Sequence, residues 1–106
     1  MSNSIALALT TVQTESDAER LAAELLDRRL AACIQIDGPI VSHYRWQGKL
    51  ERTTEYRLMI KLPESNWSRL SSTIDEVHPY DEPELIQLPV SAARQGYVQW
   101  ILDESE

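Results

Sequence analysis

The spacing of apolar residues predicts a strand followed by a helix at the start of the chain. A nearly continuous apolar run over Ser4–Val12 is typical of a central strand covered on both faces. From Ser16 to Ala32, alanine and leucine recur at helical spacing. Ser16 and Glu19 have the spacing of a capping box, so the helix is expected to begin at Ser16.

Two long segments in the middle of the chain predict a hairpin. Cys33–Trp46 is rich in β-branched and aromatic residues, and Lys49–Leu62 alternates between apolar and polar positions. Gln47-Gly48 between them is suited to a tight turn. Asp37-Gly38-Pro39 interrupts the first strand, and a bulge or bend is expected there.

The pattern then predicts a second helix, a fourth strand and a terminal helix. The second helix carries apolar residues from Trp67 to Val77, with Ser65 as its N-cap and His78 at its C-terminus. Pro83–Val90 reads as an edge strand, because Pro89 offers no N–H to a ladder. A short helix after Gly96 is expected to turn three side chains inward, namely Tyr97, Trp100 and Ile101.

This order predicts an α+β fold, a ferredoxin-like βαββαβ sandwich with a long central hairpin and an extra C-terminal helix. The 106 residues are expected to form a single domain, residues 1–106. Each hairpin segment of about fourteen residues would span roughly 46 Å. A compact domain of this size is only about 35 Å across. The hairpin should overhang its core, which favours a homo-oligomer that covers it; the alternative is a ribbon bent back onto its own sheet.

The net charge limits the expected binding partners, and the cysteine content limits the expected cellular compartment. The net charge of −7 repels nucleic acid and anionic membranes, so neither is expected as a partner. Cys33 is the single cysteine, which excludes an intrachain disulfide and fits a reducing compartment. The N-terminus has no basic region before its short apolar run, so a cytoplasmic location is expected.

The segment from His78 to Glu84 holds the strongest candidates for a metal site. Imidazole and carboxylate ligate copper and other divalent cations, which makes His78 and Glu84 candidate ligands. His78 could instead cap the helix. Asp81 and Glu82 are typical of a solvated turn.

Four further residues are candidates for a small-ligand cleft between subunits. Lys61 and Glu55 lie on the polar face of the long strand, where they could line a pocket or pair with other charges. Tyr80 could donate its hydroxyl into the same cleft, and Trp46 is an aromatic anchor whose alternative role is packing. No nucleophile, phosphate-loop or dinucleotide motif is present, so no enzyme is expected.

Four stretches, "RLAACIQI", "YRWQGKLE", "HPYDEPELIQLPV" and "YVQWILDE", occur in the order and at the intervals of the CutA family. The chain resembles this family of divalent-cation tolerance proteins over nearly its whole length. The resemblance implies a homotrimer joined through the long hairpins, with an architecture similar to that of PII signalling proteins. It also implies a role in tolerance of divalent metal ions, with copper as a candidate ligand.

The family's proposed copper ligands fall at Thr10, Val77 and Glu84 of this sequence, and only Glu84 is of a ligating type, with His78 adjacent. Three other hypotheses stay open. The chain could be a PII-like sensor that binds a small anionic metabolite with Lys61 as counter-charge. It could be an enzyme that uses His78 and Glu84 as acid and base, or a module that holds another protein.

Overall fold

The computed structural model describes residues 4–106 and contains a four-stranded sheet with three α-helices. The sheet has the order β2-β3-β1-β4, and every neighbouring pair is antiparallel. The predicted α+β, ferredoxin-like βαββαβ plan with its additional terminal helix is confirmed. The elements, in chain order, are β1 (Ile5–Val12), α1 (Glu15–Asp27), β2 (Cys33–Trp46), β3 (Lys49–Pro63), a 3-10 turn (Glu64–Asn66), α2 (Trp67–Val77), β4 (Ile86–Pro89) and α3 (Gln95–Glu104).

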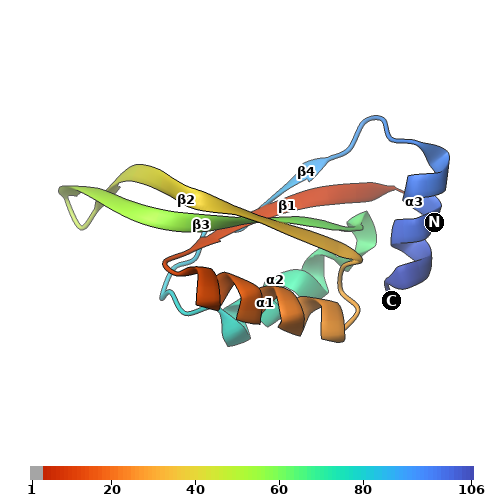
Figure 1. The fold of residues 1–106 in the computed structure, drawn as a ribbon, viewed down its shortest axis with the longest axis horizontal. Helices are drawn as coiled ribbons and strands as arrows, with labels where there is room; N and C mark the ends of the chain where they lie inside the picture. The colour runs from red at the N-terminus through yellow and green to blue at the C-terminus, as the bar shows by residue number, and fades with distance from the viewer. Residues whose placement is uncertain (1–3) are drawn as a thin grey trace.

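The helices α1 and α2 cover one face of the sheet, and the core lies between these two layers (Figure 1). Alternate residues of the two central strands point into this core and are fully buried, from Ala6 to Val12 in β1 and from Leu58 to Leu62 in β3. They pack against leucines of both helices, such as Leu25 and Leu70. The apolar face predicted for the second half of β3 is therefore confirmed.

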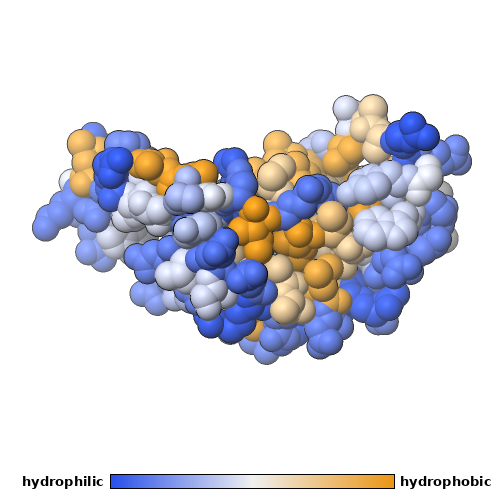
Figure 2. Space-filling model, viewed as in Figure 1, coloured by the Kyte–Doolittle hydropathy of each residue, from blue (hydrophilic) through white to orange (hydrophobic). Residues whose placement is uncertain are grey.

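The opposite face of the sheet is only partly covered within the chain. Leu7 and Leu9 of β1 are half-buried there, so the prediction that this strand is covered on both faces is wrong for a single copy. Ile86 and Leu88 of β4 are 48% and 42% exposed. Figure 2 shows hydrophobic atoms along the upper side of the hairpin, away from the two helices. Within residues 4–106, this face of the sheet therefore keeps large apolar side chains exposed.

The hairpin of β2 and β3 extends well beyond the helices, as predicted (Figure 1). β1 pairs with β3 from Tyr56 to Pro63, so among the strands of residues 4–106 Lys49–Glu55 has β2 alone as a neighbour. The molecule measures 44 Å along its longest axis against 26 and 23 Å across. A two-stranded ribbon of this length has little stability alone in water. The overhang is the dominant departure from a compact shape.

The helix caps differ from the predicted ones. Thr14, and not Ser16, is the N-cap of α1, and its hydroxyl accepts a hydrogen bond of 3.0 Å from the amide of Asp17. Ser65 lies inside the 3-10 turn that precedes α2, and Asn66 takes the N-cap position. The Asn66 side chain instead donates to the carbonyl of Leu30 at 3.0 Å, which ties the start of α2 to the segment that follows α1.

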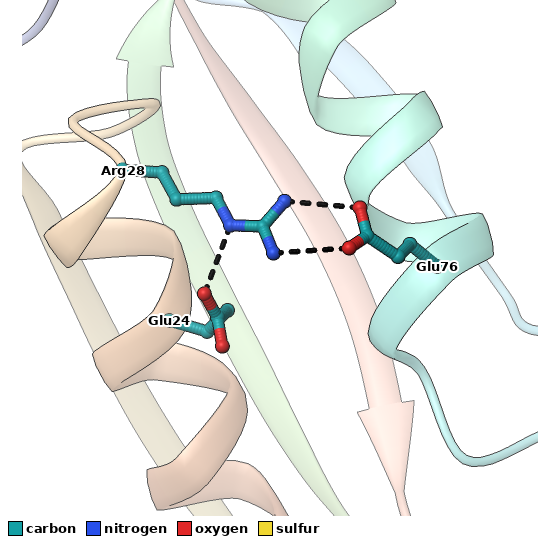
Figure 3. Close-up of polar contacts among 3 residues, drawn as sticks. All are labelled: Glu24, Arg28 and Glu76. Atoms are coloured by element: carbon teal, nitrogen blue, oxygen red, sulfur yellow. Dashed lines mark hydrogen bonds and ion pairs between the residues drawn. The ribbon is translucent and has the colours of Figure 1, made fainter.

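Arg28, directly after α1, links the two helices (Figure 3). Its Nη1 and Nη2 donate to the two carboxylate oxygens of Glu76 in α2 at 3.1 and 3.2 Å, and its Nε donates to Glu24 at 2.8 Å. These hydrogen bonds raise the pKa of Arg28 and lower that of Glu76. The planar guanidinium thus fixes the relative position of the helix ends, a geometry that lysine could not reproduce.

The end of the chain departs from the prediction in two ways. The fourth strand is an edge strand as expected, but it is limited to Ile86–Pro89. In α3, Ile101 alone of the three predicted side chains is buried; Tyr97 and Trp100 stack on each other with ring centres 5.9 Å apart and stay 38% and 44% exposed. None of the helices within residues 4–106 is long and apolar enough to cross a membrane.

A bulge interrupts the hairpin at the predicted place. The register of β2 against β3 shifts between Asp37 and Ile40. Gly38 in the bulge has a φ of +154°, and a Cβ atom at this position would lie 2.5 Å from Cδ2 of Tyr56 and 3.1 Å from the carbonyl oxygen of Glu55. Glycine is therefore required where the ribbon leaves the body of the sheet.

We predict that Gly38→Ala lowers the free energy of unfolding by about 1–3 kcal/mol, because the new methyl group collides with the Tyr56 ring. Urea unfolding followed by circular dichroism measures the change. Gly96→Ala is the matched control, since its Cβ meets nothing within 4 Å in α3; it should be neutral or stabilising by up to about 1 kcal/mol. Equal effects of the two substitutions would contradict the prediction.

Candidate functional site

A pocket of about 540 Å³ lies where β1 ends and the hairpin continues. The end of β1, the two hairpin strands and the loop after α2 form its walls. Four carboxylates line it, from Glu55, Asp81, Glu82 and Glu84. The remaining lining residues are polar or aromatic, namely Thr11, Gln13, Ser42, His43, Tyr44, Trp46, Thr53 and Tyr80. No lysine or arginine is among these twelve residues.

His78 anchors the loop that forms one wall of the pocket. Its Nδ1 accepts a hydrogen bond of 3.1 Å from the amide of Tyr80. Because an amide can only donate, the ring proton of the neutral imidazole sits on Nε2. Nε2 lies 3.0 Å from the carbonyl oxygen of Thr11 and 3.1 Å from Oγ1 of Thr10, and donates to them. Both ring nitrogens are therefore occupied by hydrogen bonds within the protein.

Thr10 continues this network to the far end of the loop. Its hydroxyl donates to the backbone carbonyl of Glu84 at 2.6 Å. The hydroxyl is fully buried, and His78 is only 9% exposed. The ring of Tyr80 meets that of His78 edge-on, with centres 4.9 Å apart. The loop is thus fixed against β1 at both of its ends.

Burial is also the main cause of the lowered pKa of His78. The hydrogen bond to Thr11 and the charges of Asp17 and Glu55 act in the opposite direction but are weaker. The folded protein therefore holds this ring in its neutral form around neutral pH. A neutral, fully hydrogen-bonded imidazole is a structural element of the loop.

Glu55 is the most buried carboxylate of the pocket. It is 8% exposed, and its Oε2 accepts a hydrogen bond of 2.7 Å from the hydroxyl of Tyr80. Burial and this hydrogen bond raise the pKa of the Tyr80 phenol, which remains protonated and donates. The pair joins the long strand to the loop across the pocket.

Glu84 lines the same pocket, and partial burial together with the charge of Glu55 raises its pKa. Partial removal from water is the first cause of its raised pKa, and repulsion by Glu55 is the second. Arg57 acts in the opposite direction, yet its guanidinium is bonded to Asp37 at 2.8 and 3.2 Å. The two glutamates therefore share a region of negative potential, and within residues 4–106 neither of them forms an ion pair.

The structure brings together most of the residues singled out in the sequence. Glu55, Trp46, Tyr80 and Glu84 all line the pocket. Lys61 does not, because it pairs with Cys33 at the opposite end of β3 and donates to the side chain of Gln35. The six-residue separation from Glu55 corresponds to about 20 Å along a strand.

Several residues of the pocket were not foreseen. Ser42 and Tyr44 alternate along β2 with Trp46, which was predicted, and that alternation was a signal in the sequence that could have identified all three together. Asp81 and Glu82 were expected only as a solvated turn; they are exposed but also contribute to the wall.

The side chains of one copy do not fit a preformed metal centre. Within residues 4–106, no group of three or more histidine, cysteine, aspartate or glutamate side chains lies close enough to hold an ion together. Val77, at one of the ligand positions suggested by the resemblance, packs against the core. Both ring nitrogens of His78 form hydrogen bonds within the protein. Two carboxylates that share a pocket, Glu55 and Glu84, can at most hold a cation that keeps part of its water.

The family described as CutA1 divalent ion tolerance protein matches residues 6–104. The chain belongs to the CutA1 family. It is 39% identical to a protein CutA homolog of Xenopus laevis over 97% of this chain and 68% of that protein. It is 41% identical to the divalent-cation tolerance protein CutA of Pectobacterium atrosepticum, over 88% of this chain and 84% of that one.

Solved structures of CutA1 proteins share the fold of this family member. The Oryza sativa structure has a TM-score of 0.94 at 32% identity and covers 99% of this chain and 98% of its own. The structure from Xylella fastidiosa has a TM-score of 0.93 at 35% identity, with coverage of 97% and 99%. The family predicted from the four sequence stretches is thereby confirmed, together with the ferredoxin-like fold.

We predict that replacing His78 changes how stability depends on pH. The unfolded chain binds a proton as the pH falls below about 6.5, whereas the folded ring resists protonation. The free energy of unfolding of the native protein should therefore be highest above this pH and decrease below it. His78→Gln should be about 2 kcal/mol less stable at pH 8, because the amide of Tyr80 loses its acceptor, and should lose less on acidification.

Denaturant unfolding at pH 8 and pH 5 measures both effects. His43→Gln is the matched control, since His43 is exposed on the hairpin. It should leave the stability and its pH dependence unchanged. If the decrease on acidification disappears in His43→Gln and persists in His78→Gln, the assignment of the buried ring is wrong.

Proposed function

We propose that three copies of this chain assemble into a homotrimer that acts in the tolerance of divalent metal ions and binds positively charged ligands. The observation that carries the charge preference is the pocket with four carboxylates and no lysine or arginine among its lining residues. The names of the CutA relatives support the link to divalent cations.

The apolar surface supports assembly through the hairpin and the open sheet face. Exposed large apolar side chains are scattered singly on ordinary monomers, but here they gather on the hairpin, β4 and α3. Val41 is 50% exposed and Leu50 is 73% exposed on the hairpin, and Trp100 is 44% exposed on α3. Neighbouring copies in a closed ring would remove these groups from water and support the overhanging ribbon.

The charge of the pocket favours a cation over a small anionic metabolite. Lys61, the counter-charge considered for a PII-like sensor, lies at the other end of β3 and contacts Gln35. An anion would enter a region of negative potential set up by Glu55 and Glu84. The PII-like alternative would therefore need basic groups from a neighbouring copy.

We further propose binding, and not catalysis, as the role of the pocket. An acid-base pair of His78 and Glu84 has no support, because the imidazole nitrogens are occupied by Thr11 and Tyr80. Glu84 and Glu55 are the proposed carboxylates for a hydrated copper(II) or other divalent ion. The cytoplasmic location stays a prediction; a structural relative from Archaeoglobus fulgidus is described as periplasmic.

We predict that the protein has three times the mass of one chain in dilute solution, measured by light scattering after gel filtration. Val41→Glu should shift the population toward monomers, because it places a charge on the apolar side of the hairpin. Leu26→Glu is the control: Leu26 is 40% exposed, but it lies on α1 in the helix layer. A monomeric native protein, or dissociation by the control alone, would contradict the proposed assembly.

Calorimetric titration tests the preference for cations. Copper(II) or zinc(II) should bind saturably, and the double variant Glu55→Gln/Glu84→Gln should weaken the binding about tenfold or more by removing two charges. His78→Ala should retain copper binding, whereas loss of binding in that variant would restore the histidine as a ligand. Saturable binding of ATP, with no binding of either metal ion, would refute the proposed charge preference and favour the PII-like alternative.

A further inference from the structure

We propose that the pocket binds an organic polyamine, an aliphatic chain that carries two or more ammonium groups. This inference rests on the proposed preference for positive charge and adds the chemical class of the ligand. It is carried by three features of the pocket: a buried carboxylate that lacks a cationic partner, an aromatic wall, and the spread of the acidic groups over a cavity larger than an ion needs.

The buried carboxylate is that of Glu55. With 8% of its surface exposed, it has lost most of its water, and a neutral hydroxyl of Tyr80 is its hydrogen-bond partner at 2.7 Å. A charge in such a place is costly unless a cation approaches it. The guanidinium of Arg57 is engaged by Asp37, and no ion pair within residues 4–106 involves Glu55, so a cationic ligand would supply the missing positive charge.

The aromatic wall distinguishes an organic cation from a metal ion. Tyr44 and Trp46 line the pocket, and in a single copy they are 40% and 47% exposed. Aromatic faces attract ammonium groups and cover methylene chains, and tryptophan is the strongest of them. A hydrated metal ion gains nothing comparable from these rings.

The dimensions and the distribution of charge fit an elongated ligand. A volume of about 540 Å³ is in the range of pockets that bind small organic molecules. Glu55 comes from β3, whereas Asp81, Glu82 and Glu84 come from the loop that faces it. The absence of three converging ligands within residues 4–106 disfavours a single dehydrated ion. Two ammonium groups on one flexible chain could reach carboxylates on both sides.

The test is calorimetric titration of the intact protein with putrescine, with butanediol as the uncharged ligand of equal carbon length. Putrescine should bind saturably at one site per chain, and butanediol should not bind. Glu55→Gln should weaken putrescine binding about tenfold, because it removes a charge-assisted contact. Trp46→Leu should weaken it about two- to fivefold through loss of the aromatic face.

Glu19→Gln is the matched control, since it removes one negative charge from the exposed surface of α1. It should bind putrescine as the native protein does. Circular dichroism and light scattering establish that each variant keeps its fold and assembly, and Glu55→Asp provides a second variant that keeps the charge and should restore part of the affinity.

The outcomes separate this inference from the function on which it rests. Copper binding without putrescine binding would overturn the inference and leave the proposed cation pocket intact. Equal weakening by Glu19→Gln and Glu55→Gln would also overturn it, because the attraction would then belong to the whole acidic surface. Binding of ATP in place of both cations would refute the inference and the proposed function together.

Discussion

The difference in length between β1 and β3 is the constraint on which the rest of this structure depends. β1 stops pairing at Tyr56, and β3 continues for seven more residues with β2 as its sole strand neighbour. At this step the sheet narrows from a covered layer to a ribbon, and the loop after α2 crosses the end of β1. The pocket, the bulge at Gly38 and the exposed apolar surface of the hairpin all arise at or beyond this step.

Where β1 ends, hydrogen bonds and not ion pairs hold the loop that carries the acidic residues of the pocket. The neutral ring of His78 and the hydroxyl of Thr10 hold the loop, which leaves carboxylates free to face the cavity. The pairs of Arg28 with Glu76 and of Arg57 with Asp37 lie outside the pocket lining. The protein therefore neutralises acids in its supporting structure and leaves those of the pocket without a basic partner, a division that suits a site for a positively charged ligand.

Periodicity and strand length were sufficient to predict the fold. The two-residue alternation of Lys49–Leu62 identified its buried face, and the excess length of the hairpin identified the overhang. Caps were predicted less well, because Thr14 and Ser16 offer the same hydroxyl chemistry two residues apart. Periodicity also failed for Tyr97 and Trp100, since it identifies an apolar face but not whether the same chain covers that face.

The site was predictable only in part for a similar reason. Alternation places Lys61 and Glu55 on one polar face, yet it does not say that the loop after α2 reaches Glu55 in the middle of β3 and not Lys61 near its end. The role of His78 depends on the threonines of β1, which are nearly seventy residues away in the chain. Only the folded arrangement reveals that the ring is a hydrogen-bonded anchor.

The edge strand β4 has a consequence for the behaviour of the protein at high concentration. It has four residues and ends at Pro89, which has no N–H to donate, so it is a poor template for an incoming strand. Sheet extension by backbone pairing is thus left to the outer edge of β2 and to the free edge of Lys49–Glu55 in β3. The edge formed by β4 is short and ends in proline, so it does not favour open-ended pairing of further strands.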